Sequence, residues 1–214
     1  MNGLRWTVTL FTVFLLLPIA GCGKKGSAPV NPEPQVTVSC IGVLPARSVV
    51  DYDDTVSFAR AKRLQEGTQL MNRLLRQHFQ GNSRIRFVND DQVAGLIGSG
   101  SETTLELHRK IAAQVSCNAI LEVTLREYAD RVGGQYSASR PASVAFDYRL
   151  IETGNGAVLC RGTFEEEQKS LMENLYNLKT ASRRGFTWIT GEQLMQEGLA
   201  ERFSECSYLQ TQDR

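Results

Sequence analysis

The sequence predicts one α/β domain in which helices flank a mixed β-sheet of about five strands, in two or three layers. Three observations lead to this prediction. Strand-like and helix-like patterns alternate along the chain, two capping boxes mark helix starts, and a Thr-Gly-Asn-Gly turn at 153–156 joins two strands. The resulting order is β-α-β-α-β-β-β-α.

The expected elements follow one another from residue 36 onward. They are a strand at 36–44, a helix at 57–79, a strand at 84–89, a helix at 103–114, strands at 118–128, 142–152 and 157–166, a further short helix at 168–180 and a last helix from 190 to about 203. Loops are expected at 46–55, 90–102 and 129–142.

The first strand and helix are read from apolar patterns. Residues 36–44 are β-branched and apolar and end at Pro45, as a strand buried on both faces does. In the helix at 57–79, the apolar residues recur at helical spacing, and Gly67 falls on their face. Because glycine in a helix costs about 1 kcal/mol, Gly67 is expected to permit close approach to the sheet.

The later helices and strands carry their own boundary signals. Thr103 with Glu106, and Thr190 with Gln193, have the spacing of capping boxes at helix starts. Apolar residues alternate with polar ones through 142–152, and a turn signal leads into the strand at 157–166. This pair is the clearest β-hairpin in the chain.

The N-terminal segment has the order of a secretory signal peptide. Arg5 precedes the apolar run Trp6–Leu17, and small residues precede Cys22. The run is too short for a transmembrane helix, which needs about 20 residues. An ordinary secretory signal with a coincidental cysteine is the remaining alternative.

This ending resembles the lipobox of bacterial lipoproteins, in which the chain is cut before a lipid-modified cysteine. The resemblance implies a signal peptide at 1–21, lipidation of Cys22 (palmitate included) and attachment to a membrane through the lipid. Gly23 resembles the outer-membrane sorting pattern of diderm bacteria. We therefore expect an exported protein, anchored to the outer membrane and facing the periplasm.

A short tether separates the anchor from the domain. Residues 22–35 hold the lipidated cysteine and a segment rich in Pro, Gly and Ser, which reaches at most about 40 Å. The α/β domain is expected at 36–206, with a loose tail at 207–214. Outside 1–21 the chain carries 23 basic and 23 acidic residues. No nucleic-acid partner is expected, because that needs a basic stripe.

Four cysteines remain once Cys22 is lipidated, namely Cys40, Cys117, Cys160 and Cys206. In an oxidising compartment they allow up to two disulfides with three connectivities. We expect at least one disulfide and leave its pairing open. Since no CxxC is present and neither histidine has a partner at ligand spacing, no metal site or cofactor is expected.

Enzyme signatures are missing from the predicted domain at 36–206, which has no G-x-S-x-G, H-E-x-x-H, Walker loop or G-x-G-x-x-G. The protein is therefore not expected to be an enzyme. Two loops suggest binding instead, because Tyr, Trp and Arg are enriched at interface hot spots. The candidate partner surface consists of Arg131, Tyr136, Arg140, Arg183, Arg184, Phe186 and Trp188. Trp188 packed beneath the last helix is the structural alternative.

The strand ending at Leu44-Pro45, the helix with Gly67 and the strand at 119–125 after a cysteine-bearing turn resemble a known α/β domain. That domain is shared by curli-secretion-type lipoproteins, the lipoprotein activators of penicillin-binding proteins and the N-terminal domain of TolB, and the resemblance covers 36–166. FEEEQKSLMENL and RRGFTWITGEQL resemble a segment of uncharacterised deltaproteobacterial lipoproteins, which implies no activity.

The expected function is that of a non-catalytic, lipid-anchored periplasmic accessory protein that binds an envelope protein partner in assembly or transport. Two alternatives stay open. One is a periplasmic hydrolase acting on cell-wall or lipid material, and the other is a structural lipoprotein that oligomerises through an edge strand. The oligomeric state is left open.

Overall fold

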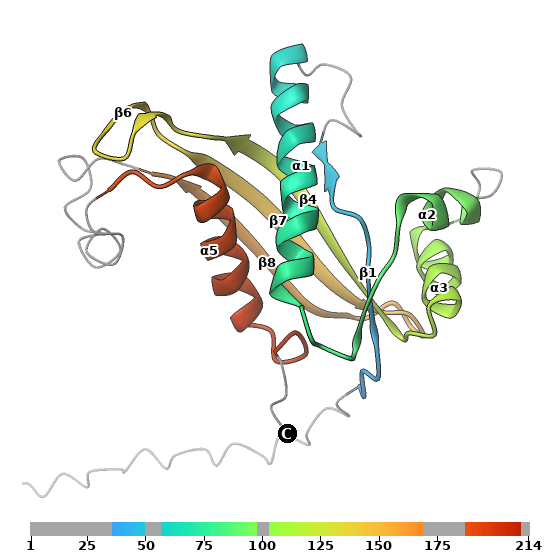
Figure 1. The fold of residues 1–214 in the computed structure, drawn as a ribbon. Coiled ribbons are helices and arrows are strands. Elements are labelled where there is room, and N and C mark those ends of the chain that lie inside the picture. The colour runs from blue at the N-terminus through green and yellow to red at the C-terminus, as the bar shows by residue number, and fades with distance from the viewer. Residues whose placement is uncertain (1–35, 50–56, 98–102, 169–186, 211–214) are drawn as a thin grey trace, which may run out of the picture. The chain divides into compact units, whose positions relative to one another are not determined.

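Six strands form the central sheet of the computed structural model, which describes residues 36–49, 57–97, 103–168 and 187–210 (Figure 1). Contacts group Val36–Arg214 into one unit. The strands of the sheet are β1 (Ile41–Val43), β2 (Arg47–Ser48), β3 (Ile85–Phe87), β4 (Ala119–Ala129), β7 (Ser143–Glu152) and β8 (Val158–Glu167). The described helices are α1 (Phe58–His78), α2 (Asp90–Leu96), α3 (Thr104–Gln114) and α5 (Gly191–Ser204).

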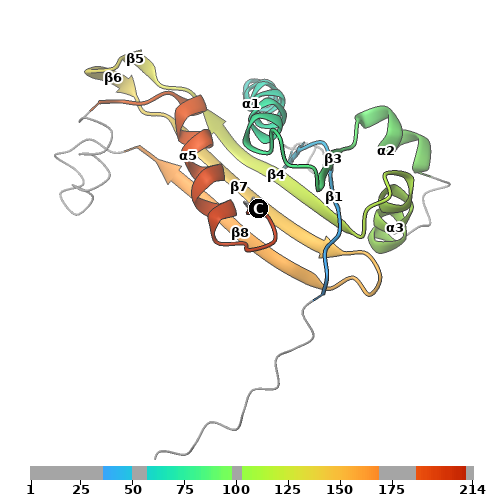
Figure 2. The same cartoon turned by 60° about the horizontal axis from the view of Figure 1, so that its bottom comes forward.

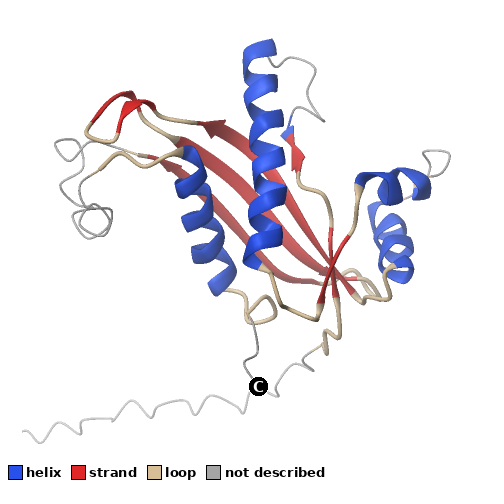
Figure 3. Cartoon of the chain, in the orientation of Figure 1, coloured by secondary structure: helices blue, strands red, loops and turns tan. Residues whose placement is uncertain are grey.

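The sheet is mixed, as predicted. Its order is β3-β1-β4-β7-β8, and β2 pairs with β4 further along that strand. The pairs of β1 with β3 and with β4 are parallel, whereas the β4–β7 and β7–β8 pairs are antiparallel (Figure 3). The predicted α/β fold class and the hairpin at 153–156 are therefore confirmed.

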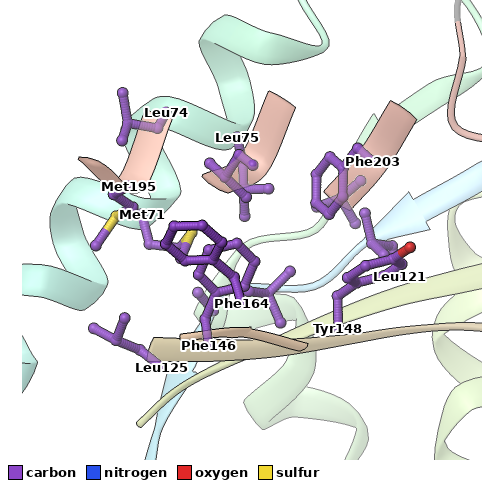
Figure 4. Close-up of a cluster of buried hydrophobic side chains, with 14 of the residues drawn as sticks. Met71, Leu74, Leu75, Leu121, Leu125, Phe146, Tyr148, Phe164, Met195 and Phe203 are labelled. Carbon is purple, nitrogen blue, oxygen red and sulfur yellow. The ribbon is translucent and has the colours of Figure 1, made fainter. Parts of the chain in front are cut away.

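Helices α1 and α5 cover one face of the sheet (Figure 2). Side chains alternate along a strand, so β4 turns Leu121 and Leu125 toward these helices. The register places Phe146 beside Leu125 and Phe164 beside Phe146 on the same face. Figure 4 shows these side chains under those of α1 and α5, which contribute Met71, Leu74, Leu75, Met195 and Phe203.

Helices α2 and α3 pack on the opposite face, at the end of the sheet where β1 meets β4. Ile120 lies between Ala119 and Leu121 in sequence and points the other way, into a second apolar cluster with Ile111 of α3 and Val93 of α2. Further along that face β8 exposes Arg161, Thr163 and Glu165. Helices thus cover the two faces unequally within the described residues.

Gly67 brings α1 close to the sheet, as the sequence predicted. A Cβ atom there would lie 2.6 Å from Cγ of Tyr128 and 2.8 Å from Cδ2 of Leu125. Both distances are shorter than real contacts, so only glycine fits without movement.

The first strand is shorter than predicted. Only Ile41–Val43 of the expected 36–44 pair with neighbouring strands. Before them, Oδ1 of Asn118 accepts a hydrogen bond from the backbone N–H of Ser39 (3.0 Å), and its Nδ2 donates to the carbonyl of Thr37 (2.8 Å). A side chain, rather than a strand ladder, therefore holds residues 37–39.

Each of the three predicted loops contains structure in its described part. The loop at 46–55 contains β2, the loop at 90–102 contains α2, and the loop at 129–142 contains a small hairpin of β5 (Val132–Gly134) and β6 (Ser137–Arg140). Helix α2 begins with a capping box of Asn89 and Gln92, a signal present in the sequence. The prediction of plain loops was wrong at these places.

The tail expected to be loose at 207–214 packs against the core in part of its described residues, 207–210. Leu209 is 2% exposed, and its backbone N–H donates to the carbonyl of Cys206 at 3.0 Å. Leu209 and the partly buried Tyr208 therefore pack on the core, and 211–214 lie outside the described residues.

Several predicted segments also lie outside the described residues, namely the signal segment, Cys22, the tether and the helix at 168–180 beyond Gln168. None of the described helices combines the length and the apolar character needed to cross a membrane.

Candidate partner-binding surface

The hairpin β5–β6 carries three of the residues predicted to bind a partner. Tyr136 lies between the two strands and is 78% exposed. Arg140 ends β6 and is exposed, while Arg131 directly precedes β5 and is partly buried. The hairpin therefore presents an aromatic ring and a guanidinium group to solvent.

Trp188 lies against this hairpin although it is far away in sequence. Its backbone N–H donates to the carbonyl of Gln135 at 2.7 Å. Its carbonyl accepts a hydrogen bond from a guanidinium nitrogen of Arg131. The two loops that the sequence singled out thus meet at a junction of main-chain and side-chain hydrogen bonds.

Gln168 ties the same segment to the end of β8. It is 8% exposed. Its Nε2 donates to the carbonyl of Thr187 at 2.8 Å, and its Oε1 accepts from the N–H of Ile189 at 2.9 Å. Its own N–H donates to the carbonyl of Ala142 at 3.0 Å. One buried amide therefore fixes residues 187–189 against the sheet.

Asp130 links the base of the hairpin to α5. Its Oδ1 accepts from the N–H of Gly191 and from that of Arg131, both at 2.8 Å. Tyr128 lies nearby, and a Cβ on Gly191 would lie 3.0 Å from its ring. Burial, with added repulsion from Asp130 and Glu192, raises the pKa of Tyr128 to about 12, so it stays protonated and neutral at pH 7.

A depression of about 960 Å³ lies between this junction and α5. Arg131, Gln135 and Trp188 line one side of it, and Gln193, Gln196 and Glu197 of α5 line the other. These groups offer hydrogen-bond donors and acceptors beside one indole ring. Such a polar surface with an aromatic anchor suits a peptide or protein segment.

The predicted partner residues divide into three groups. Arg131 and Trp188 are in direct contact. Tyr136 and Arg140 lie on the same hairpin. Arg183, Arg184 and Phe186 lie outside the described residues, so their part in this surface stays a prediction.

The four cysteines are paired in the structure. Cys40 joins Cys117, with Cα atoms 4.5 Å apart, and Cys160 joins Cys206, with Cα atoms 5.9 Å apart. The first disulfide holds the segment before β1 against the turn before β4. The second joins the edge strand β8 to the end of α5.

Sequence reasoning missed a charged cluster around His108. This histidine of α3 is 3% exposed, and its Nε2 lies 2.7 Å from Oε1 of Glu122 on β4. Because a carboxylate only accepts, Nε2 carries the hydrogen. Oε2 of Glu122 also accepts from Arg149 at 2.7 Å. A search for partners at ligand spacing overlooks Glu122, because it lies on another element.

The environment of Glu122 favours its ionised form. Burial raises the pKa of this carboxyl, but the hydrogen bond and charge of His108, together with Arg149, outweigh burial and lower the pKa below 4.5. Within the described parts of the chain, no three His, Cys, Asp or Glu side chains are grouped as metal ligands would be.

No protein-family model matches the chain. No curated protein matches it either.

Solved structures provide the remaining comparisons. The chain is similar to the PelC dodecamer from Paraburkholderia phytofirmans, with 14% identity and a TM-score of 0.44 over 82% of this chain and 89% of that one. It is similar to the LpoB C-terminal domain from Escherichia coli, with 16% identity and a TM-score of 0.37 over 64% and 88%. A lipoprotein from Neisseria meningitidis gives 14% identity and 0.36 over 69% and 98%.

Proposed function

We propose that this chain is an exported, lipid-anchored accessory protein that binds a protein of the bacterial envelope and performs no catalysis. The observation that carries the proposal is the junction of the β5–β6 hairpin with Trp188. It combines a Trp, an exposed Tyr and two Arg residues, the residue types most enriched at interface hot spots.

The junction is also held in place before any partner arrives. Arg131, Gln168 and Asp130 each fix part of it by hydrogen bonds. Because the junction is already ordered, binding a partner costs less conformational entropy, which favours affinity. The two disulfides agree with export, since such bonds persist in oxidising compartments.

In-cell photocrosslinking tests the partner-binding function. A photoreactive amino acid replaces Tyr136, and a matched variant carries it at Val158, which is 49% exposed at the opposite end of the β7–β8 pair. We expect one discrete adduct with an envelope protein from position 136 and none from position 158.

A second substitution makes that experiment specific. R140A in the same chain is expected to reduce the adduct from position 136 several-fold, because it removes the exposed guanidinium of the hairpin. Equal adducts from both positions, or no adduct from position 136 in a correctly localised protein, would contradict the proposed surface.

The outer-membrane location is part of the same proposal and rests on the sequence around Cys22. Cys22→Ser removes the thiol that carries the lipid, so the chain is expected to stay unprocessed or lose its outer-membrane placement. Fractionation of cells, with Ser27→Ala in the predicted tether as the control substitution, measures this. Normal outer-membrane recovery of Cys22→Ser would overturn the anchor.

A further inference from the structure

A second cavity lies far from the hairpin junction, between α3 and the sheet on the face opposite α1 and α5. Its volume is about 600 Å³, within the range of about 300–1,000 Å³ that is typical of small-molecule sites. Leu44, Leu107 and Ile111 give it an apolar wall, and Ile97 adds an exposed apolar side chain. Figure 2 shows α3 beside β4 at this end of the sheet.

More positively charged than negatively charged side chains line this cavity among the described residues. Glu122 is its one carboxylate among the described lining residues, and Arg47 and Arg149 supply two guanidinium groups. Both carboxylate oxygens of Glu122 already have a partner, because His108 and Arg149 each bind one of them at 2.7 Å. The cavity therefore carries a net positive charge even when His108 is neutral.

The two arginines lie within reach of a common ligand. On the sheet, Arg47 is the register partner of Thr124, and Arg149 is the register partner of Glu122, one step along the same face of β4. Arg47 is exposed and has no ion pair within the described residues. The side chain of Arg149 is 56% exposed, and one of its amino groups binds Glu122, which leaves further N–H donors.

We propose that this cavity binds a small organic monoanion with an apolar body. The apolar wall of Leu44, Leu107 and Ile111 would cover the body, and Arg47 and Arg149 would bind the anionic group at the mouth. The His108–Glu122 pair would hold Arg149 in position. Charge-assisted bonds to guanidinium are the strong ones for carboxylates and phosphates. This site is separate from the hairpin junction and does not depend on the proposed function.

Calorimetric titration of the full chain in phosphatidylcholine nanodiscs tests the proposal, with empty nanodiscs as the blank. The probes are 4-phenylbutyrate, 4-phenylbutanol, 4-phenylbutylamine and inorganic phosphate. We expect 4-phenylbutyrate to bind, and the alcohol to bind at least about tenfold more weakly, because it loses the charged contacts. The amine and inorganic phosphate should bind no better than the alcohol.

Three variants tie the binding to the cavity. R47A and R149A should each weaken 4-phenylbutyrate binding about tenfold. Glu122→Gln should strengthen it, because the amide oxygen still accepts a hydrogen bond from Arg149 while the competing negative charge is lost. R140A, an exposed arginine on the hairpin, should leave it within twofold, so a failure here is distinct from a failure of the partner surface.

Other outcomes would overturn the site. Equal binding of the acid, the alcohol and the amine would show that the site does not prefer an anion. Binding of inorganic phosphate as tight as that of 4-phenylbutyrate would show that the site does not require an apolar ligand body. No binding of 4-phenylbutyrate, or unchanged binding in both arginine variants, would also overturn the site. R149K keeps the charge and guards against misfolding of R149A, because it should retain most of the affinity.

Discussion

Gly67 sets the distance between α1 and the sheet. Its missing side chain leaves room for Tyr128 and Leu125. The sequence identified the position because a glycine on the apolar face of a helix needs a packing reason. It did not identify Tyr128 as the neighbour, because which ring lies opposite depends on the register of β4 against α1.

Gly67→Ala is therefore expected to destabilise the protein. The new methyl group would meet the Tyr128 ring at 2.6 Å, and overpacking costs about 1–3 kcal/mol. Alanine would regain about 1 kcal/mol in helix propensity. Urea unfolding should show a net loss. The control Gly95→Ala, where nothing lies within 4 Å of the added Cβ, should be neutral or stabilising.

Glu122 predicts a pH-dependent stability. The pKa of its carboxyl is lowered in the folded protein below the usual 4.5. The ionised form therefore stabilises the fold, and this stabilisation is fully present above pH 4.5. This contribution is lost as the pH falls below 4.5 through the folded pKa. Glu122→Gln should cost about 1–3 kcal/mol at pH 7, because buried His108 loses a charged acceptor.

The measurement compares urea unfolding of wild type and Glu122→Gln at pH 7 and near pH 3. The difference between the two proteins should shrink at the lower pH. The control Glu66→Gln, on the exposed side of α1, should stay within about 0.5 kcal/mol at pH 7. A difference for Glu122→Gln that grows as the pH falls would contradict this account.

At the scale of elements, local signals found the long segments and missed the short ones. The capping boxes at Thr103 and Thr190 start α3 and α5 where predicted. Strand β2 has two residues and is stabilised by pairing with β4, a long-range contact that local sequence does not reveal. The β5–β6 hairpin has mainly small, polar or glycine residues, which leave no alternating apolar pattern.

The sequence predicted which residue types form the candidate surface, but not how they are arranged in space. Arg131 and Trp188 were chosen because of their residue types, while Gln168 and Asp130, which hold them together, gave no such signal. Both act through hydrogen bonds to backbone groups distant in sequence. A single sequence does not reveal hydrogen bonds between residues so far apart in the chain.

Gln168→Ala should loosen the segment that leads into α5. It removes two hydrogen bonds to Thr187 and Ile189 in a buried position, and an unpaired buried polar group costs about 1–3 kcal/mol. Amide hydrogen exchange of Ile189 should accelerate. The control Gln196→Ala, exposed on α5, should leave that amide unchanged; equal exchange in both variants would refute the role of Gln168.

At the scale of the molecule, two disulfides close loops of the chain, with sequence separations of 77 and 46. We expect both to form in an oxidising compartment. Alkylation without reductant should then modify none of the four cysteines, and alkylation after reduction should modify all four. Intact mass measures the difference, and four alkylated cysteines without reductant would contradict the prediction.

Loss of either disulfide should destabilise the fold by roughly 2–4 kcal/mol, because the unfolded chain regains loop entropy. Thermal unfolding of Cys40→Ser/Cys117→Ser and of Cys160→Ser/Cys206→Ser, each with the other bond intact, measures this. An unchanged melting temperature in either pair would show that its bond contributes nothing.

The Cys40–Cys117 bond also determines how the domain would bear mechanical load. Without this bond, a pull on the chain ahead of residue 36 would load β1, whose three residues of parallel pairing resist shear only weakly. The covalent link at Cys40 diverts that force to Cys117, two residues before the eleven-residue strand β4. The central strand of the sheet, rather than β1, would then take the strain between the proposed membrane anchor and the proposed partner.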